Sequence, residues 1–163
     1  MIFILFISFV ILLRIGELFL SKKNERWLLK NGAVEYGEKH YPLIIVLHSL
    51  FFISLIIEYS RQQAPSFSLL ILLFYFAILT LKVWIISSLG KFWNTKIYRI
   101  KNTPLIKAGP YKYLKHPNYI VVVAEIAAIP LIFNLYYTAV IFSLLNAIIL
   151  TLRIKEENIA LQI

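Results

Sequence analysis

The chain has 163 residues, of which 60% are hydrophobic and only 15% are charged, and it contains no cysteine. Soluble domains carry about 25% charged residues, so this composition excludes a water-soluble globule. The lack of cysteine excludes disulfides, thiolate metal sites and a cysteine nucleophile. A net charge of +9 would suggest nucleic acid binding in a soluble domain, but here the basic residues lie between apolar runs, where they set membrane topology and attract anionic headgroups. We therefore expect one membrane-embedded domain over residues 1–163, with membrane lipids and no nucleic acid as partners.

Five apolar segments follow one another along the chain, at residues 2–20, 42–59, 67–87, 119–133 and 136–152. A span of the hydrocarbon core needs about 20 residues, and backbone hydrogen bonding in lipid requires each span to be a helix. The first segment has neither a basic start nor a cleavage site, so we interpret it as a retained span. The last two are short and separated only by Asn134 and Leu135, which predicts a tight C-terminal helical hairpin, with Pro130 placed to end or kink its first arm. The sequence thus predicts an all-α integral membrane protein with about five transmembrane helices.

Lysine and arginine are distributed very unequally between the two sides of these spans. Residues 21–41 carry five, residues 88–118 carry seven and the C-terminal tail adds two, whereas the opposite side carries only Arg61. Basic residues concentrate in cytoplasmic loops, so we expect a multi-pass protein with its N-terminus outside and its C-terminus and both long loops in the cytoplasm. In a bacterium the membrane would be the inner membrane.

The loop at residues 88–118 is too long for a plain connector and is rich in aromatic residues, glycine and proline. The aromatic residues alone would fit an interfacial belt at the membrane surface. The turn residues favour a shaped cytoplasmic cap over the helices.

The segment GPYKYLKHPNY, at residues 109–119, holds the densest set of polar and aromatic residues. Pro117 suits the first turn of the fourth span, so His116 lies at the start of that helix, where free backbone N–H groups form a positively polarised anion site. Lys112 and Lys115 add positive charge. This pattern indicates a site for a carboxylate or phosphate, and the alternative is an ordinary helix start with interfacial lysine and tyrosine.

The segment RIKEE, at residues 153–157, lies at the cytoplasmic end of the fifth predicted span. Arg153 lies three and four residues before Glu156 and Glu157, so it shares a helix face with them, and a surface ion pair is the simplest interpretation. Carboxylates at a helix C-terminus oppose the helix dipole, however, and a cationic ligand would account for them. The hairpin brings these residues to the level of His116. The two segments together predict a cytoplasmic pocket that fits S-adenosylmethionine, although NADPH or a phospholipid headgroup would fit its basic end as well.

Several ionisable residues lie inside the predicted spans, where they are energetically unfavourable and often functional. Arg14 and Glu17 are three residues apart near the cytoplasmic end of the first span, so they can pair or extend to the interface. Glu125 lies two turns into the fourth span and would reach an acceptor if it faces the bundle. Lys82 and Glu58 are expected to be paired or to extend to the interface.

The run at residues 109–119, the hairpin and the R-x-x-E-E pattern at residues 153–157 together resemble the isoprenylcysteine carboxyl methyltransferase family. The family pattern is G-x-Y-x-x-x-[RK]-H-P-x-Y followed by R-x-x-E-E. Segments of the N-terminal half, together with LGKFWNT at residues 89–95, resemble the small bacterial branch, whose members often O-methylate alkylpyrone- or alkylresorcinol-type lipids. The resemblance implies an S-adenosylmethionine-dependent methyltransferase acting on a carboxyl, enol or phenol oxygen of a lipophilic acceptor that enters from the bilayer.

The resemblance also assigns residues to the site. By motif position, the cofactor-binding residues would be Tyr111, Tyr113, His116, Pro117, Tyr119, Glu156 and Glu157. Arg153 would lie near the reacting groups, where Glu156 and Glu157 are further catalytic candidates. The weaker candidates for contact with the acceptor are Arg14, Glu17 and Glu125. No metal site is expected.

Three other functions remain open from the sequence. An NADPH-dependent reductase of the sterol-reductase type resembles this family in its C-terminal half, although five spans are few for it. A phospholipid N-methyltransferase differs in its acceptor, and a non-enzymatic lipid-binding membrane protein would have no cofactor affinity.

The chain has Ile120 and Val121 where many family members have glycine, and it lacks the longer tail of the eukaryotic enzymes, which weakens the case for a prenylcysteine acceptor.

Overall fold

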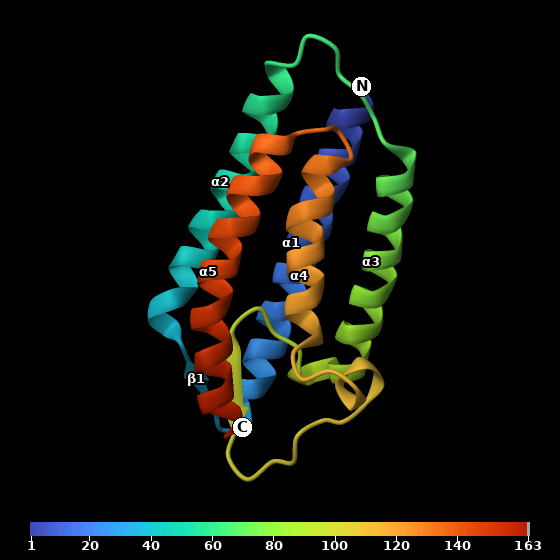
Figure 1. Ribbon diagram of the computed structural model, residues 1–163. Coiled ribbons are helices and arrows are strands. Elements are labelled where there is room, and N and C mark those ends of the chain that lie inside the picture. Colours follow the sequence, from blue (N-terminus) through green and yellow to red (C-terminus); the bar gives the residue numbers. More distant parts are fainter. Residues whose placement is uncertain (163) are drawn as a thin grey trace.

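The computed structural model describes residues 1–162 and shows a bundle of helices with a small cap at one end (Figure 1). The helices are α1 (Ile2–Lys30), α2 (Tyr41–Ser60), α3 (Leu69–Leu89), α4 (Pro117–Leu131) and α5 (Tyr136–Leu161). Three short 3-10 turns are η1 (Glu38–His40), η2 (Gly90–Phe92) and η3 (Gly109–Lys112). Strands β1 (Ala33–Tyr36) and β2 (Ile97–Ile100) pair antiparallel. The cap consists of residues 31–40 and 90–116.

Within residues 1–162, four helices are long and apolar enough to cross a membrane, namely α1, α3, α5 and the helix that contains α2. The helix over the fourth predicted span, α4, has only 15 residues, which is about 22 Å at 1.5 Å per residue and less than the roughly 30 Å of a hydrocarbon core. It ends at Leu131, whereas the apolar pattern predicts a helix to residue 133. The chain turns at Asn134, which has a φ of +54°, and the N–H groups of Asn134 and Leu135 donate back to the oxygens of Leu131 at 3.2 Å and Pro130 at 3.0 Å, a Schellman-type helix end. Pro130 lies inside the helix and does not end it.

Two helices run beyond the bounds that hydropathy predicts. The α1 helix continues to Lys30 and α5 to Leu161, ten and nine residues past the predicted span ends at 20 and 152. A helix does not have to stop where its residues become polar, and both extensions carry the polar side chains that meet the cap. The strands are a second difference, because β1 and β2 lie in segments for which the sequence predicts only loops.

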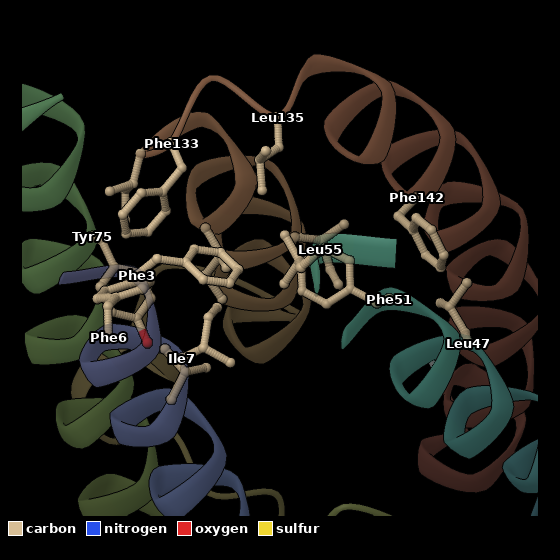
Figure 2. Close-up of a cluster of buried hydrophobic side chains, with 14 residues drawn as sticks. Phe3, Phe6, Ile7, Leu47, Phe51, Leu55, Tyr75, Phe133, Leu135 and Phe142 are labelled. Atoms are coloured by element: carbon tan, nitrogen blue, oxygen red, sulfur yellow. The ribbon is translucent and has the colours of Figure 1, made fainter. Parts of the chain in front are cut away.

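The main hydrophobic core lies at the end of the bundle away from the cap, and aromatic rings dominate it (Figure 2). Phe3 stacks on Tyr59 with ring centroids 3.8 Å apart, and Phe133 meets the edge of Phe3 at 5.0 Å. Leu135, in the turn between α4 and α5, is fully buried. Such pairs add about 0.5–1.5 kcal/mol each to the apolar burial, so this end holds the turn and the N-terminus of α1 in place.

A carboxylate from α2 caps the first turn of α5. Glu58 accepts hydrogen bonds from the backbone N–H groups of Tyr137 at 3.1 Å and Thr138 at 2.7 Å. The first turn of a helix has free N–H groups and a partial positive charge, so this contact pairs the Glu58 charge and fixes α5 against α2.

The polar end of α1 anchors the cap. Asn24 donates hydrogen bonds to the backbone oxygens of Gly90 at 3.2 Å and Trp93 at 2.7 Å. Ser21 exchanges hydrogen bonds with Asn94 and accepts one from the backbone N–H of Thr95 at 3.1 Å. The segment that follows α3 is therefore held at fixed points on a rigid helix.

A second polar cluster joins the sheet to α1. Lys96 lies 3.2 Å from a carboxylate oxygen of Glu25 and 3.1 Å from one of Glu35. The Tyr98 hydroxyl lies 2.5 and 2.7 Å from oxygens of the same two carboxylates, which share its single proton. Burial raises the pKa of Tyr98, and the hydrogen bonds to the two glutamates raise it further, so the phenol stays neutral. The cluster fixes β2, which forms one wall of the site described next.

Candidate functional site

A cavity of about 340 Å³ opens at the capped end of the bundle. Its walls come from η2, β2, the residues before η3, the start of α4 and the last turns of α5. The residues that line it include Trp93, Tyr111, His116, Tyr119, Arg153 and Glu157. The volume lies at the lower end of the range of about 300–1,000 Å³ that is typical of small-molecule sites.

The side chain of Arg153 links the three walls of the cavity. Its Nε donates to the hydroxyl of Tyr119 at 3.2 Å, and its guanidinium carbon lies 5.7 Å from the centre of the Tyr119 ring. A terminal nitrogen donates to the backbone oxygen of Thr95. Arg153 is thus held by α4 on one side and the cap on the other, which fixes the direction of its remaining N–H groups.

His116 is the N-cap residue of α4 and faces the last turns of α5. Its Nε2 lies 3.0 Å from Asn158 Oδ1, within hydrogen-bonding distance. Nδ1 lies 3.6 Å from Glu157 Oε2 and has no hydrogen-bond partner within residues 1–162. The ring also stacks on Tyr119 with centroids 5.5 Å apart. The cavity therefore holds an imidazole ring beside a carboxylate.

Gly109 allows η3 to pack against α3 and brings Tyr111 into the cavity. Its φ is +53°, and an added Cβ would lie 2.0 Å from Ser88 Oγ, so no other residue fits without movement. Burial raises the pKa of the Tyr111 phenol, and the nearby Glu157 carboxylate adds to the increase, so Tyr111 is present as a neutral hydroxyl.

Positive charge dominates the cavity wall. Its charged lining residues are Lys96, Arg99, Lys107, Lys115, Arg153 and Glu157. Glu25 and Glu35 offset the charge of Lys96 from outside the cavity, and four cations remain against one carboxylate. A cleft with this balance attracts anionic groups.

The structure brings five of the predicted site residues to one cavity and places the others elsewhere. Tyr111, His116, Tyr119, Arg153 and Glu157 line the cavity. The exceptions among the motif residues are Tyr113, which is 76% exposed, Pro117, which is buried without lining the cavity, and Glu156.

Glu156 lies on the other side of Arg153 from the main cavity. Its Cβ and Cγ pack 3.4 Å from the position of a Cβ on Gly37, and with His40 it lines a separate chamber of about 10 Å³. That volume is close to the space of one water molecule. The two adjacent glutamates therefore occupy different environments, although they are neighbours in the sequence.

The three weaker candidates lie inside the bundle, away from the cavity, and form a closed charge ring with Lys82. Arg14 donates to Glu17 at 2.9 Å and to Glu125 at 2.7 Å. Lys82 contacts Glu125 at 2.9 Å and also pairs with Glu17. The spacing correctly predicts the Arg14–Glu17 pair. Each of the four groups meets two opposite charges, so the ring is neutral and internally satisfied, and its geometry gives no support to a direct contact with an acceptor.

Sequence reasoning missed Trp93, Thr95 and Asn158 as parts of the site. Trp93 and Thr95 belong to the LGKFWNT segment, which the family resemblance includes. The sequence therefore marks this segment but assigns no function to either residue. Asn158 carries no signal, because a polar residue at the exposed end of a helix is ordinary. Within residues 1–162, no group of three or more histidine, aspartate or glutamate side chains is placed to hold a metal ion.

Together, the apolar helices and the polar cavity define a helical membrane protein with a cavity at one end. The chain belongs to the isoprenylcysteine carboxyl methyltransferase (ICMT) family, which matches residues 69–163. It is 44% identical over 162 residues to the uncharacterised protein YpbQ of Bacillus subtilis, covering 98% of this chain and 96% of that protein. It is 29% identical over 158 residues to an uncharacterised Haemophilus influenzae protein, covering 93% and 90% of the two chains. No solved structure gives a significant match. Family membership indicates a membrane methyltransferase.

Proposed function

We propose that this protein transfers a methyl group from S-adenosylmethionine to a carboxyl, enol or phenol oxygen of a lipophilic acceptor. The observation that supports this most directly is the convergence of the α4 start and the α5 end on one cavity. His116 and Tyr119 come from one helix and Arg153 and Glu157 from the other. Membership of the methyltransferase family adds the class of reaction.

The residues of the cavity fit the proposed cofactor. S-Adenosylmethionine supplies an electrophilic methyl group on a sulfonium and also carries a carboxylate and an ammonium. The cationic wall suits a carboxylate, and Glu157 supplies a negative charge for a cation. Two buried polar atoms of lining residues, His116 Nδ1 and Trp93 Nε1, have no partner within residues 1–162, so the cavity offers unused hydrogen-bonding capacity.

Methyl transfer requires alignment and a partly dehydrated acceptor oxygen more than extensive acid–base chemistry. Arg153 is held by Thr95 and Tyr119, and its free N–H groups would orient the acceptor oxygen. If the acceptor is an enol or phenol, its proton must leave as the new bond forms. The Nδ1 of His116 and the carboxylate of Glu157 lie 3.6 Å apart and are placed to take that proton.

The proposed topology places the cap and the C-terminus in the cytoplasm and the α4–α5 turn toward the opposite face. Exposed cations at the capped end, such as Lys22, Lys30 and Lys112, support this orientation. A polar cofactor would then enter the cavity from the cytosol. The acceptor would enter sideways from the bilayer, with its apolar tail left among the exposed side chains of the helices.

Calorimetric titration of the purified protein with S-adenosylhomocysteine tests the cofactor. Micromolar binding supports the proposal, whereas binding of NADPH alone would indicate a reductase and binding of neither would favour a non-enzymatic protein. Incubation with methyl-labelled S-adenosylmethionine and a membrane lipid extract would then identify the acceptor, and labelled phosphatidylethanolamine would indicate N-methylation instead.

Adjacent residues provide matched variants. Glu157→Gln is expected to weaken cofactor binding or turnover about 10- to 100-fold, as for the loss of a contact to a charged group. Glu156→Gln should have a smaller effect, because Glu156 lies outside the cavity. Arg153→Lys should lower turnover, while Lys155→Arg serves as its control on the same helix. Wild-type turnover in both Glu157→Gln and Arg153→Lys would contradict the assignment.

A further inference from the structure

One buried hydrogen-bond donor in the cavity wall has no partner in the protein. Trp93 is 3% exposed and lines the cavity. Its indole Nε1 has no hydrogen-bond partner within residues 1–162. A buried polar group without a partner is rare in folded proteins, because it has lost its water and gained nothing in return. Water or a bound molecule in the cavity must therefore supply the acceptor.

The backbone around Trp93 is held by several hydrogen bonds, which fix the point from which its indole side chain extends. Asn24, itself 5% exposed, donates to the Trp93 backbone oxygen at 2.7 Å. The Trp93 backbone N–H donates a hydrogen bond to the backbone oxygen of Gly90 at 3.2 Å. The next residue, Asn94, donates to the backbone oxygen of Ser21 at 2.9 Å. These contacts fix the tryptophan from both sides along the chain.

The chemistry of the partner follows from the donor and from its surroundings. An indole N–H can only donate, so the ligand atom must be an acceptor. The cavity lining also includes Arg99, Lys107 and Lys115, so a negatively charged oxygen is favoured over a neutral nitrogen. We infer that Trp93 is a ligand-binding residue of the cavity, whose indole N–H donates a hydrogen bond to a carboxylate or other anionic oxygen of the bound molecule.

Two molecules of the proposed reaction carry such an oxygen, namely the cofactor and an acidic acceptor. The identity of the ligand rests on the proposed function, whereas the role of Trp93 rests on its burial and its unpaired donor. The chain contains three tryptophans, and the other two are not among the residues that line the cavity. Trp84, on α3, is 53% exposed. Trp27, on α1, packs against Phe92 of η2. They serve as internal references.

Indole N–H resonances of the ¹⁵N-labelled protein in detergent micelles test the inference without any loss of structure. The three signals are assigned with Trp27→Phe, Trp84→Phe and Trp93→Phe. S-Adenosylhomocysteine is added in one arm and the membrane lipid extract in the other. The Trp93 proton is expected to move downfield in at least one arm, and the arm in which it moves tells whether the cofactor or the acceptor provides the oxygen. The Trp27 and Trp84 signals should stay in place.

Binding measurements complete the test. Trp93→Phe keeps an aromatic ring but removes the donor, so it should weaken binding of that ligand about 10- to 100-fold, while Trp84→Phe should leave the affinity unchanged. If S-adenosylhomocysteine binds calorimetrically but the Trp93 signal moves in neither arm, the inference is wrong and the proposed function stands. If nothing binds to the wild-type protein, the proposed function fails as well.

Discussion

The charge ring in the bundle predicts a strong dependence of stability on charge balance. Lys82 is 5% exposed and lies 2.9 Å from Glu125 while also pairing with Glu17. At an effective dielectric constant of about 20, one such contact is worth about 6 kcal/mol before desolvation is considered. Removal of one partner from a buried ion pair leaves a charge uncompensated and typically costs about 3–5 kcal/mol. Lys82→Met should therefore lower the free energy of unfolding by about 3–5 kcal/mol, which corresponds to a drop in Tm of roughly 10 °C for a chain of this size.

A balanced double variant separates charge from packing. Lys82→Met combined with Glu17→Gln removes one positive and one negative charge and leaves the Arg14–Glu125 pair intact. If charge balance controls stability, the double variant should be more stable than Lys82→Met alone, with a coupling energy of about 2 kcal/mol in a double-mutant cycle. Thermal unfolding in detergent, followed by tryptophan fluorescence, measures both effects. Additive losses, or a Tm for Lys82→Met within a degree or two of wild type, would refute the reasoning.

Two further predictions concern opposite ends of the molecule. Gly109→Ala should lower the free energy of unfolding by at least about 1–2 kcal/mol, because its φ is +53° and its Cβ would collide with Ser88, and it should weaken S-adenosylhomocysteine binding. Gly16→Ala is the control: its Cβ meets no atom within 4 Å, and it should be neutral or stabilising by up to about 1 kcal/mol. Glu58→Ala removes the cap of α5 and should lower the free energy of unfolding by about 1–2 kcal/mol, with cofactor affinity unchanged because the contact lies at the end away from the cavity. A loss of affinity equal to that of Gly109→Ala would contradict this separation.

The elements that the sequence predicts well are those with local signals. Apolar runs of sufficient length identify helices, and Pro117 and the R-x-x-E-E spacing place His116, Arg153 and Glu157 at helix ends that a short turn brings together. The spacing also predicts the Arg14–Glu17 pair. Each of these depends on residues close together in the chain, where helix geometry decides which side chains meet.

What the sequence could not predict depends on contacts between distant residues. The β1–β2 pairing joins two four-residue strands with weak patterns of their own, and contacts of Lys96 and Tyr98 with Glu35 and with Glu25 of α1 accompany it. Helix geometry separates Glu156 from Glu157, but the packing of Glu156 against Gly37 is a contact with the distant cap that no local pattern indicates. Lys82 and Glu125 are clearly unusual in apolar helices, yet no local rule indicates that they complete a ring with α1.

The pairing of β1 with β2 also limits when the cap can fold during synthesis of the chain. Residues 33–36 leave the ribosome before α2 and α3, and their partner strand follows only after both helices have been made. Until then, Glu25 and Glu35 lack their partners Lys96 and Tyr98, and Ser21 and Asn24 lack the residues 90–95 that they contact. The helices can therefore insert into the membrane one after another, but the ligand cavity closes late, as a joint product of the first and last parts of the chain.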